Sequence, residues 1–440
     1  MSRTLRARLE ALGPAWLAGA IAAGPATMAS LLTAGSGYGY ALLWAVLLSV
    51  ALGTFTQYLS MRLGLLAGDG IVSATKQSLG RWWAGLLVAD ALLAAGLAQL
   101  VILYGLANTS VALFGGDATL WGVGWSVFVA IALAGGGYQI AEAGAKLLVS
   151  LVVLAFVGSL FVVPIETGGL AAGLVPSFPA GSPVVVAGVL GGAVHITLIT
   201  MHTYTVRSRG WGVADYDLAT TDVIGSMGVA FGLYSLAVFL VAGSVLTGQS
   251  PSAVEAGRAL GPLVGPFAER LFLAGLLGAA VSTLGGNSIV PPYLLADFFG
   301  WERTRADSRY RVALALSALA AAFGVLFAGS FLSLLVIVLS VGLVGTPLAI
   351  ALVLYLLNDR DVVARTPRTV TNLAGGVTLL VVSVINVRQL TAKLEPSGTL
   401  EYLLAGFAVV VGLATLIVVA KIGRQLLDGS PDVRTTSSSE

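Results

Sequence analysis

The 440-residue sequence contains no cysteine and only two histidines, His195 and His202. Disulfides, iron–sulfur clusters, cysteine-ligated zinc and thiol catalysis are therefore excluded. Charged residues are also scarce, at 10% of the chain, against roughly 25% in soluble domains. The formal net charge is only +2, so we expect no basic surface that would attract nucleic-acid phosphates. These deficits exclude a soluble globular enzyme, a disordered chain and a nucleic-acid-binding protein.

Apolar residues are abundant instead, at 57% of the chain. A membrane-spanning helix needs about 20 predominantly apolar residues, so the composition alone predicts an all-α membrane protein with about a dozen spans. The hydrophobic pattern divides into twelve segments: 14–36, 40–62, 83–109, 121–137, 146–164, 184–206, 221–247, 270–297, 311–328, 332–357, 370–387 and 401–420.

The positive-inside rule gives an orientation. With the N-terminus inside, most of the 23 lysines and arginines lie on the cytoplasmic side, and only Arg258, Arg270, Arg388 and Lys393 lie outside. We therefore expect a single membrane domain over residues 1–440, with both termini, 1–13 and 421–440, in the cytoplasm. The expected location is the inner (cell) membrane of a prokaryote.

Two segments contain residues that interrupt helices. Gly24-Pro25 lies in the middle of segment 14–36, and Gly191-Gly192 precedes His195 in segment 184–206. Proline lacks a backbone N–H and glycine tolerates an unwound backbone. The alternative for Gly24-Pro25 is a simple proline kink, and the alternative for His195 is a packing histidine bonded to a neighbouring carbonyl. Interruptions at corresponding positions of two halves are typical of inverted-repeat transporters, which predicts five-helix repeats over 14–164 and 184–357 and two additional helices over 370–420.

Several stretches carry a family resemblance. They are Thr33–Trp44, Gln57–Gly64, Gly137-Tyr138-Gln139 with Glu142, Leu334-Leu335-Val336, and Pro347-Leu348-Ala349. In these stretches the sequence resembles the Nramp family of divalent-metal transporters. The resemblance implies a LeuT-type fold in which helices 1 and 6 are interrupted.

The same resemblance implies a substrate site, and here the sequence departs from the family. The family's Asp-Pro-Gly-Asn at the helix 1 break is matched by Gly24-Pro25-Ala26-Thr27, and its Met-Pro-His in helix 6 is matched by His195-Ile196-Thr197. Its helix 10 glutamine is matched by Gly345. The resemblance therefore places substrate binding at Gly24, Pro25, Ala26, Thr27, His195, Thr197 and Gly345, with His195 and Thr27 as the candidate metal ligands.

The family's helix 3 carboxylates, which are linked to proton movement, fall on or near Leu97 and on Gln99 or Leu100. None of these residues titrates, so we expect weak or absent proton coupling. The remaining coupling candidates are His202 and Asp90, and for Asp90 a buried pairing role is an equal alternative. Asp297, at the end of segment 270–297, is expected to be solvated at the membrane surface.

The lost ligands decide the expected substrate. Without the aspartate, no fixed charge at the helix 1 break offsets the desolvation of an ion, and without methionine the preference for soft metals is lost. We expect transport of a small cation, most simply a divalent ion that keeps its waters, such as Mg²⁺, rather than tightly bound Mn²⁺ or Fe²⁺. A small organic cation or polar metabolite is one alternative, and a non-transporting sensor or scaffold is another.

An enzyme is not expected, because the sequence has no HExxH motif, phosphate loop or carboxylate cluster. We expect no cofactor. The expected partners are the cation and the lipid bilayer, without nucleic acid, and the sequence does not specify an oligomeric state.

Overall fold

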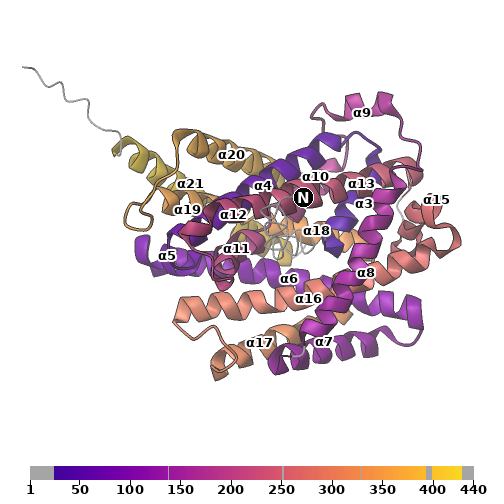
Figure 1. The fold of residues 1–440 in the computed structure, drawn as a ribbon, viewed down its shortest axis with the longest axis horizontal. Helices are drawn as coiled ribbons and strands as arrows, with labels where there is room; N and C mark the ends of the chain where they lie inside the picture. The colour runs from indigo at the N-terminus through magenta and orange to yellow at the C-terminus, as the bar shows by residue number, and fades with distance from the viewer. Residues whose placement is uncertain (1–23, 137, 250–251, 328, 393–398, 429–440) are drawn as a thin grey trace, which may run out of the picture.

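The computed structural model describes residues 24–136, 138–249, 252–327, 329–392 and 399–428, and within these ranges every regular element is helical (Figure 1). The long helices are α3 (Pro25–Tyr38), α4 (Leu43–Leu66), α6 (Arg81–Phe114), α7 (Ala118–Gly135), α8 (Tyr138–Ser159), α10 (Ser182–Ala193), α11 (Ile196–Ser208), α13 (Phe231–Val245), α16 (Ala268–Phe299), α17 (Ser308–Ala320), α18 (Phe331–Gly342), α19 (Thr346–Asn358), α20 (Thr369–Thr391) and α21 (Thr399–Asp428). The short helices are α5 (Ile71–Ser78), α9 (Thr167–Gly173), α12 (Tyr216–Val223), α14 (Ala253–Ala256) and α15 (Gly261–Val264). Between α12 and α13 the chain forms a π-helix, η2 (Ile224–Ala230).

The predicted membrane segments correspond closely to the helices. The described part of the chain contains eleven helical spans long and apolar enough to cross a membrane, and they coincide with the last eleven of the twelve predicted segments. The first segment, 14–36, lies partly outside the described residues, and its described part is α3. Eleven of the twelve predicted spans are therefore confirmed within the described residues, and α21 accounts for the last of them.

The largest boundary error concerns segment 146–164. The corresponding helix, α8, begins at Tyr138 and ends at Ser159. Glu142 precedes the predicted segment and Lys146 begins it, yet both lie within α8. They form an ion pair of 2.7 Å between positions i and i+4 of α8, and this pairing accommodates both charges on a helix.

The predicted interruption in segment 184–206 is confirmed. Helix α10 ends at Ala193 and α11 begins at Ile196, with Val194 and His195 in non-helical conformations between them. Segment 332–357 contains a further interruption that was not predicted, since α18 ends at Gly342 and α19 begins only at Thr346. In the first segment, α3 begins at Pro25, and the part that precedes Gly24 lies outside the described residues.

The two broken spans form the centre of the molecule. In each of them 83% of the most hydrophobic stretch is buried, against 22–33% for α7, α8, α17, α20 and α21. Helix α3 packs against α10, α13 and α18, and α10 packs directly against α18. Helices α20 and α21 cover α19, whereas α7 and α17 pack together elsewhere on the periphery (Figure 1). Interrupted backbone at membrane depth is tolerated only inside such a protein envelope.

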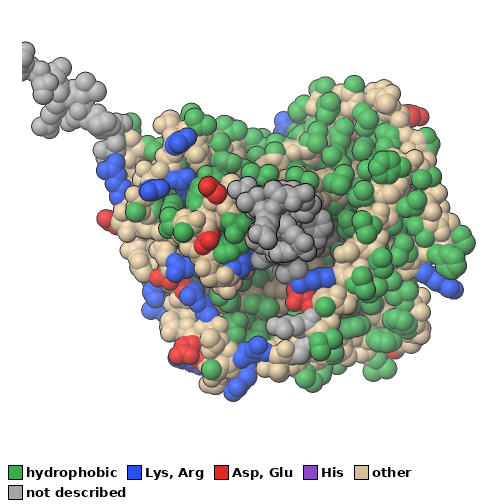
Figure 2. Space-filling view, viewed as in Figure 1, with side chains coloured by type: hydrophobic (Ala, Val, Ile, Leu, Met, Phe, Trp, Pro, Cys, Tyr) green, Lys and Arg blue, Asp and Glu red, His purple; other side chains and the backbone are tan. Residues whose placement is uncertain are grey.

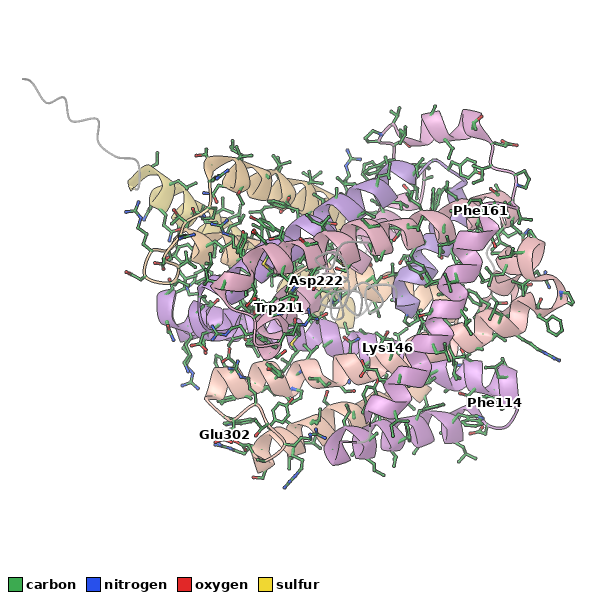
Figure 3. The ribbon with its side chains drawn as sticks, viewed as in Figure 1. Phe114, Lys146, Phe161, Trp211, Asp222 and Glu302 are labelled. Carbon is green, nitrogen blue, oxygen red and sulfur yellow. The ribbon has the colours of Figure 1, made fainter. Side chains whose placement is uncertain are left out.

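The two ends of the bundle differ in charge. Basic side chains gather at the left end of Figure 2, where Figure 1 places α5 and α12. Figure 3 shows Trp211 and Glu302 toward this basic end, and Phe114 and Phe161 at the other. This distribution agrees with the positive-inside prediction, under which the basic end faces the cytoplasm.

Candidate functional site at two helix breaks

His195 occupies the break between α10 and α11. It is the N-cap residue of α11, and its Nδ1 atom lies 2.7 Å from Thr197 Oγ1 and 3.3 Å from the Thr197 amide nitrogen. The side chain is buried, and Nε2 has no hydrogen-bond partner among the described residues. The Nε2 edge of the ring packs on Gly342, where a Cβ atom would collide with it. The imidazole of the sixth span therefore lies against the break of the tenth.

The ring proton decides what His195 can do. Nδ1 accepts a hydrogen bond from the Thr197 amide and also contacts the Thr197 hydroxyl, so in the neutral ring the proton lies on Nε2, whose N–H edge faces Gly342. This tautomer is an assignment from the contacts.

The break between α18 and α19 is held on two sides. Thr346 donates a hydrogen bond to the carbonyl of Val194 at 2.9 Å, which ties this break to the one at His195. From α20, Asn386 donates to the Val344 carbonyl at 3.1 Å, and Gln389 donates to the Ser340 carbonyl at 2.7 Å. Carbonyls that a helix end leaves without intrahelical partners are thus bound by side-chain amides.

Asp90 reaches the same break from α6. Its side chain is 4% exposed, and Oδ2 has no hydrogen-bond partner within the described ranges. The carboxyl group packs directly on Gly345, where a Cβ atom would overlap it. None of the described lysines and arginines forms an ion pair with it. A carboxyl group buried in this way must carry a proton or be balanced by a bound cation.

The helix 1 residues lie beside these breaks. Gly24 is the N-cap of α3, Pro25 is its first residue, and Ala26 is partly exposed. Thr27 is buried, and an ideal Cβ atom on Gly192 would lie 2.7 Å from its Oγ1 atom. Only glycine at position 192 therefore permits this approach of α3 to α10. Thr27 thus lies against Gly192, three residues before His195, whereas His195 and Asp90 contact Gly342 and Gly345 of the α18–α19 break.

His202 is placed differently from His195. It lies on α11, and its Nδ1 atom hydrogen-bonds to the side-chain oxygen of Gln57 on α4. Gln99, at or next to a position of the family's helix 3 carboxylates, donates to Ser288 Oγ at 2.8 Å. The two coupling candidates, His202 and Asp90, thus contact different neighbours and share no bond.

Asp297 corrects one expectation. Its side chain is 7% exposed rather than solvated. It accepts hydrogen bonds from the Ser73 amide at 3.1 Å, from Ser73 Oγ at 2.8 Å and from Tyr204 OH at 2.7 Å. Arg303 adds an ion pair at 3.5 Å. We refer to these four residues as the Asp297 network, which joins α5, α11 and the end of α16.

Sequence reasoning missed Gly342, Thr346, Asn386 and Gln389. The available signals were the glycines and Pro347 within a few residues of each other, and two amide side chains in a membrane segment. Amides in such segments commonly bond across helices.

A cavity of about 450 Å³ lies elsewhere, between α7, α8, α16 and α17. Tyr138, Arg303 and Arg305 are among its lining residues, and no residue of either break is.

Comparison with known proteins identifies the family of this chain. Residues 15–392 match the family described as natural resistance-associated macrophage protein-like, Nramp. The chain belongs to the Nramp family. It is 26% identical to the divalent metal cation transporter MntH of Bacillus subtilis over 66% of this chain and 73% of that protein. It is also 26% identical to MntH of Deinococcus radiodurans, over 66% of this chain and 71% of that one.

Solved structures show the same fold. A manganese transporter of Eremococcus coleocola aligns over 96% of both chains with a TM-score of 0.74 and 16% identity. Mhp1, a nucleobase-cation-symport-1 family transporter, aligns over 94% of this chain and 92% of that one, with a TM-score of 0.57 and 18% identity. The predicted LeuT-type inverted repeat is therefore confirmed. Membership of a membrane-transporter family confirms that this integral membrane protein is not an enzyme.

Proposed function

We propose that this Nramp protein is a secondary transporter that moves a small divalent cation across the membrane by alternating access. The observation that carries the proposal is the buried His195, whose Nε2 atom has no partner in the described protein and lies between two helix breaks. Ion sites formed by interrupted helices near the membrane midplane are typical of inverted-repeat transporters. Relatives named as divalent metal cation transporters support the choice of a metal ion.

The ligands favour an ion that keeps part of its water shell. Among the described residues there is no group of three or more His, Cys, Asp or Glu side chains that could hold a metal. One imidazole and scattered hydroxyls cannot replace the full shell of a divalent ion. Mg²⁺ loses its waters reluctantly and usually keeps several when bound, so it suits this site better than tightly bound Mn²⁺ or Fe²⁺. Imidazole by itself favours transition metals, so the two classes must be compared directly.

The proposed path follows the helix breaks. We assign substrate contact to Gly24, Pro25, Ala26, Thr27, His195, Thr197 and Gly345, with His195 and Thr27 nearest to the ion and His202 and Asp90 as coupling candidates. The proposed location is the cell membrane of a prokaryote, with the basic end and both termini facing the cytoplasm.

Uptake into vesicles tests the proposal. Purified protein in liposomes should take up Mg²⁺ saturably, as reported by an enclosed fluorescent indicator, and should show no higher affinity for Mn²⁺. His195→Ala should abolish saturation, because it removes the only imidazole at the breaks. Asn108→Ala is the control, since among the described residues the Asn108 side chain bonds within its own helix, to the Tyr104 carbonyl. Saturable uptake of neither ion would refute metal transport, and saturable uptake of methylammonium alone would establish the organic-cation alternative.

A further inference from the structure

Two polar side chains from different helices meet the same short break. Asp90 from α6 covers Gly345, and His195 covers Gly342, three residues earlier in the sequence. The intervening backbone is tightly turned, because the Val344 amide bonds to the Val341 carbonyl at 2.9 Å and the Thr346 amide bonds to the Leu343 carbonyl at 3.2 Å. The carboxyl and imidazole groups therefore reach the same break at two positions three residues apart.

Neither group is satisfied by the described protein. Asp90 Oδ2 and His195 Nε2 have no hydrogen-bond partners there, so they are not bonded to each other. Two other buried carboxylates differ, since Asp222 pairs with Arg209 and Asp297 pairs with Arg303. A buried charge needs a partner. A cation beside Asp90 would neutralise the carboxylate.

The local backbone favours positive charge at this point. Helix α10 ends at Ala193 and α18 ends at Gly342, and these two helices pack against each other. The C-terminal end of a helix carries partial negative charge and attracts cations. Gly345, in contrast, is the N-cap of α19, and the positive end of that helix suits the carboxylate of Asp90.

We propose that the Asp90 carboxylate binds the transported divalent cation at the α18–α19 break, beside the His195 ring, a site that rests on the transport function proposed above. The carboxylate from α6 supplies the negative charge that the sequence Gly24-Pro25-Ala26-Thr27 lacks. Gly345 is part of the same arrangement, because any side chain there would collide with the Asp90 carboxyl group. An amide at position 345 and a carboxylate at position 90 exclude each other.

The collision at Gly345 provides the test. A Cβ atom added at position 345 would overlap the carboxyl group of Asp90. Once Asp90 is shortened to alanine, an aspartate at position 345 can therefore place a carboxylate in the same space. Four variants should be compared with wild type: Asp90→Asn, Asp90→Ala, Asp90→Ala/Gly345→Asp and Asp90→Ala/Gly345→Asn. The probes are Mg²⁺ and Mn²⁺, with binding measured by calorimetry in detergent and uptake measured in proteoliposomes.

Asp90→Asn and Asp90→Ala should each weaken ion binding at least about tenfold, since a charge-assisted contact is lost. The Asp90→Ala/Gly345→Asp protein should regain binding, whereas the matched Asp90→Ala/Gly345→Asn protein should not. Asp117→Asn removes the same charge from an exposed helix N-cap and should bind like wild type. Melting temperatures identify any variant that fails to fold, and Asp90→Asn is close enough in shape to remain informative.

Wild-type binding kept by Asp90→Asn would overturn the proposal, as would equal binding by the two double variants. These results can be told apart from a failure of the proposed function. If the proposed function fails, the wild-type protein itself takes up neither Mg²⁺ nor Mn²⁺.

Discussion

Two aspartates, Asp90 and Asp297, are both buried in this membrane protein but have opposite surroundings. Asp297 lies in a network with Ser73, Tyr204 and Arg303, and its oxygens accept from three donors in addition to the guanidinium. Asp90 lies against the α-carbon of Gly345, and its Oδ2 atom has no bond to the described chain.

The difference distinguishes a buried carboxylate that stabilises the fold from one that is available to bind a ligand. The Asp297 network has its charge and hydrogen bonds satisfied by the protein, and Arg303 also lies 5.4 Å from the Tyr204 ring centroid and 5.6 Å from that of Tyr293. A buried ion pair of this kind is strongly destabilising to break. A carboxyl group kept without such partners gains nothing for the fold, which is why we assign Asp90 to ion binding.

The largest expected effect comes from breaking the Asp297 network. Asp297→Ala should lower the free energy of unfolding in detergent by about 2–3 kcal/mol, because it leaves Tyr204 and Ser73 without an acceptor and Arg303 without its partner. We place the loss below that of a fully buried pair because Arg303 is 33% exposed. In the absence of ions, Asp90→Asn should not lower stability. Equal losses in both variants, measured by denaturant or thermal unfolding, would remove the distinction between the two aspartates.

The contact between Asp90 and Gly345 gives the next effect. Gly345→Ala should destabilise the protein by about 1–3 kcal/mol through overpacking. The same change in an Asp90→Ala background should cost clearly less, because the colliding carboxyl is gone, and a double-mutant cycle measures this coupling. Gly376→Ala is the control, since nothing lies within 4 Å of a Cβ atom there. Additive effects of the two substitutions would contradict the contact.

The smallest expected effect concerns the α20 amides. Asn386→Ala and Gln389→Ala should each cost about 1 kcal/mol, because each leaves a carbonyl at the α18–α19 break without its donor. Both should also reduce ion uptake, since the break that carries Gly342 and Gly345 is no longer held. Val387→Ala, at a position that is 58% exposed between them, should change neither quantity appreciably. Unchanged uptake in both amide variants would show that the break holds its shape without α20.

Hydrophobicity predicted most of the fold, but it could not predict every break. Gly191-Gly192 before His195 correctly indicated the interruption in the sixth span. The similar signal of Gly345 and Pro347 in the tenth span was missed. Proline alone is no guide, since α16 continues through Pro291 and Pro292 without ending. Whether a helix breaks depends on whether neighbouring side chains can satisfy the freed backbone groups, as Thr346 and Asn386 do here.

The sequence by itself determined the membrane class, the number and approximate limits of the spans, and the loss of the family's usual ligands. Those properties follow from composition and from residues close together in the chain. Only the tertiary structure decided that Asp90 meets Gly345 and that His195 meets Gly342. These partners belong to different helices and are far apart in sequence, so their contact arises from helix packing, for which local hydrophobic patterns carry no information.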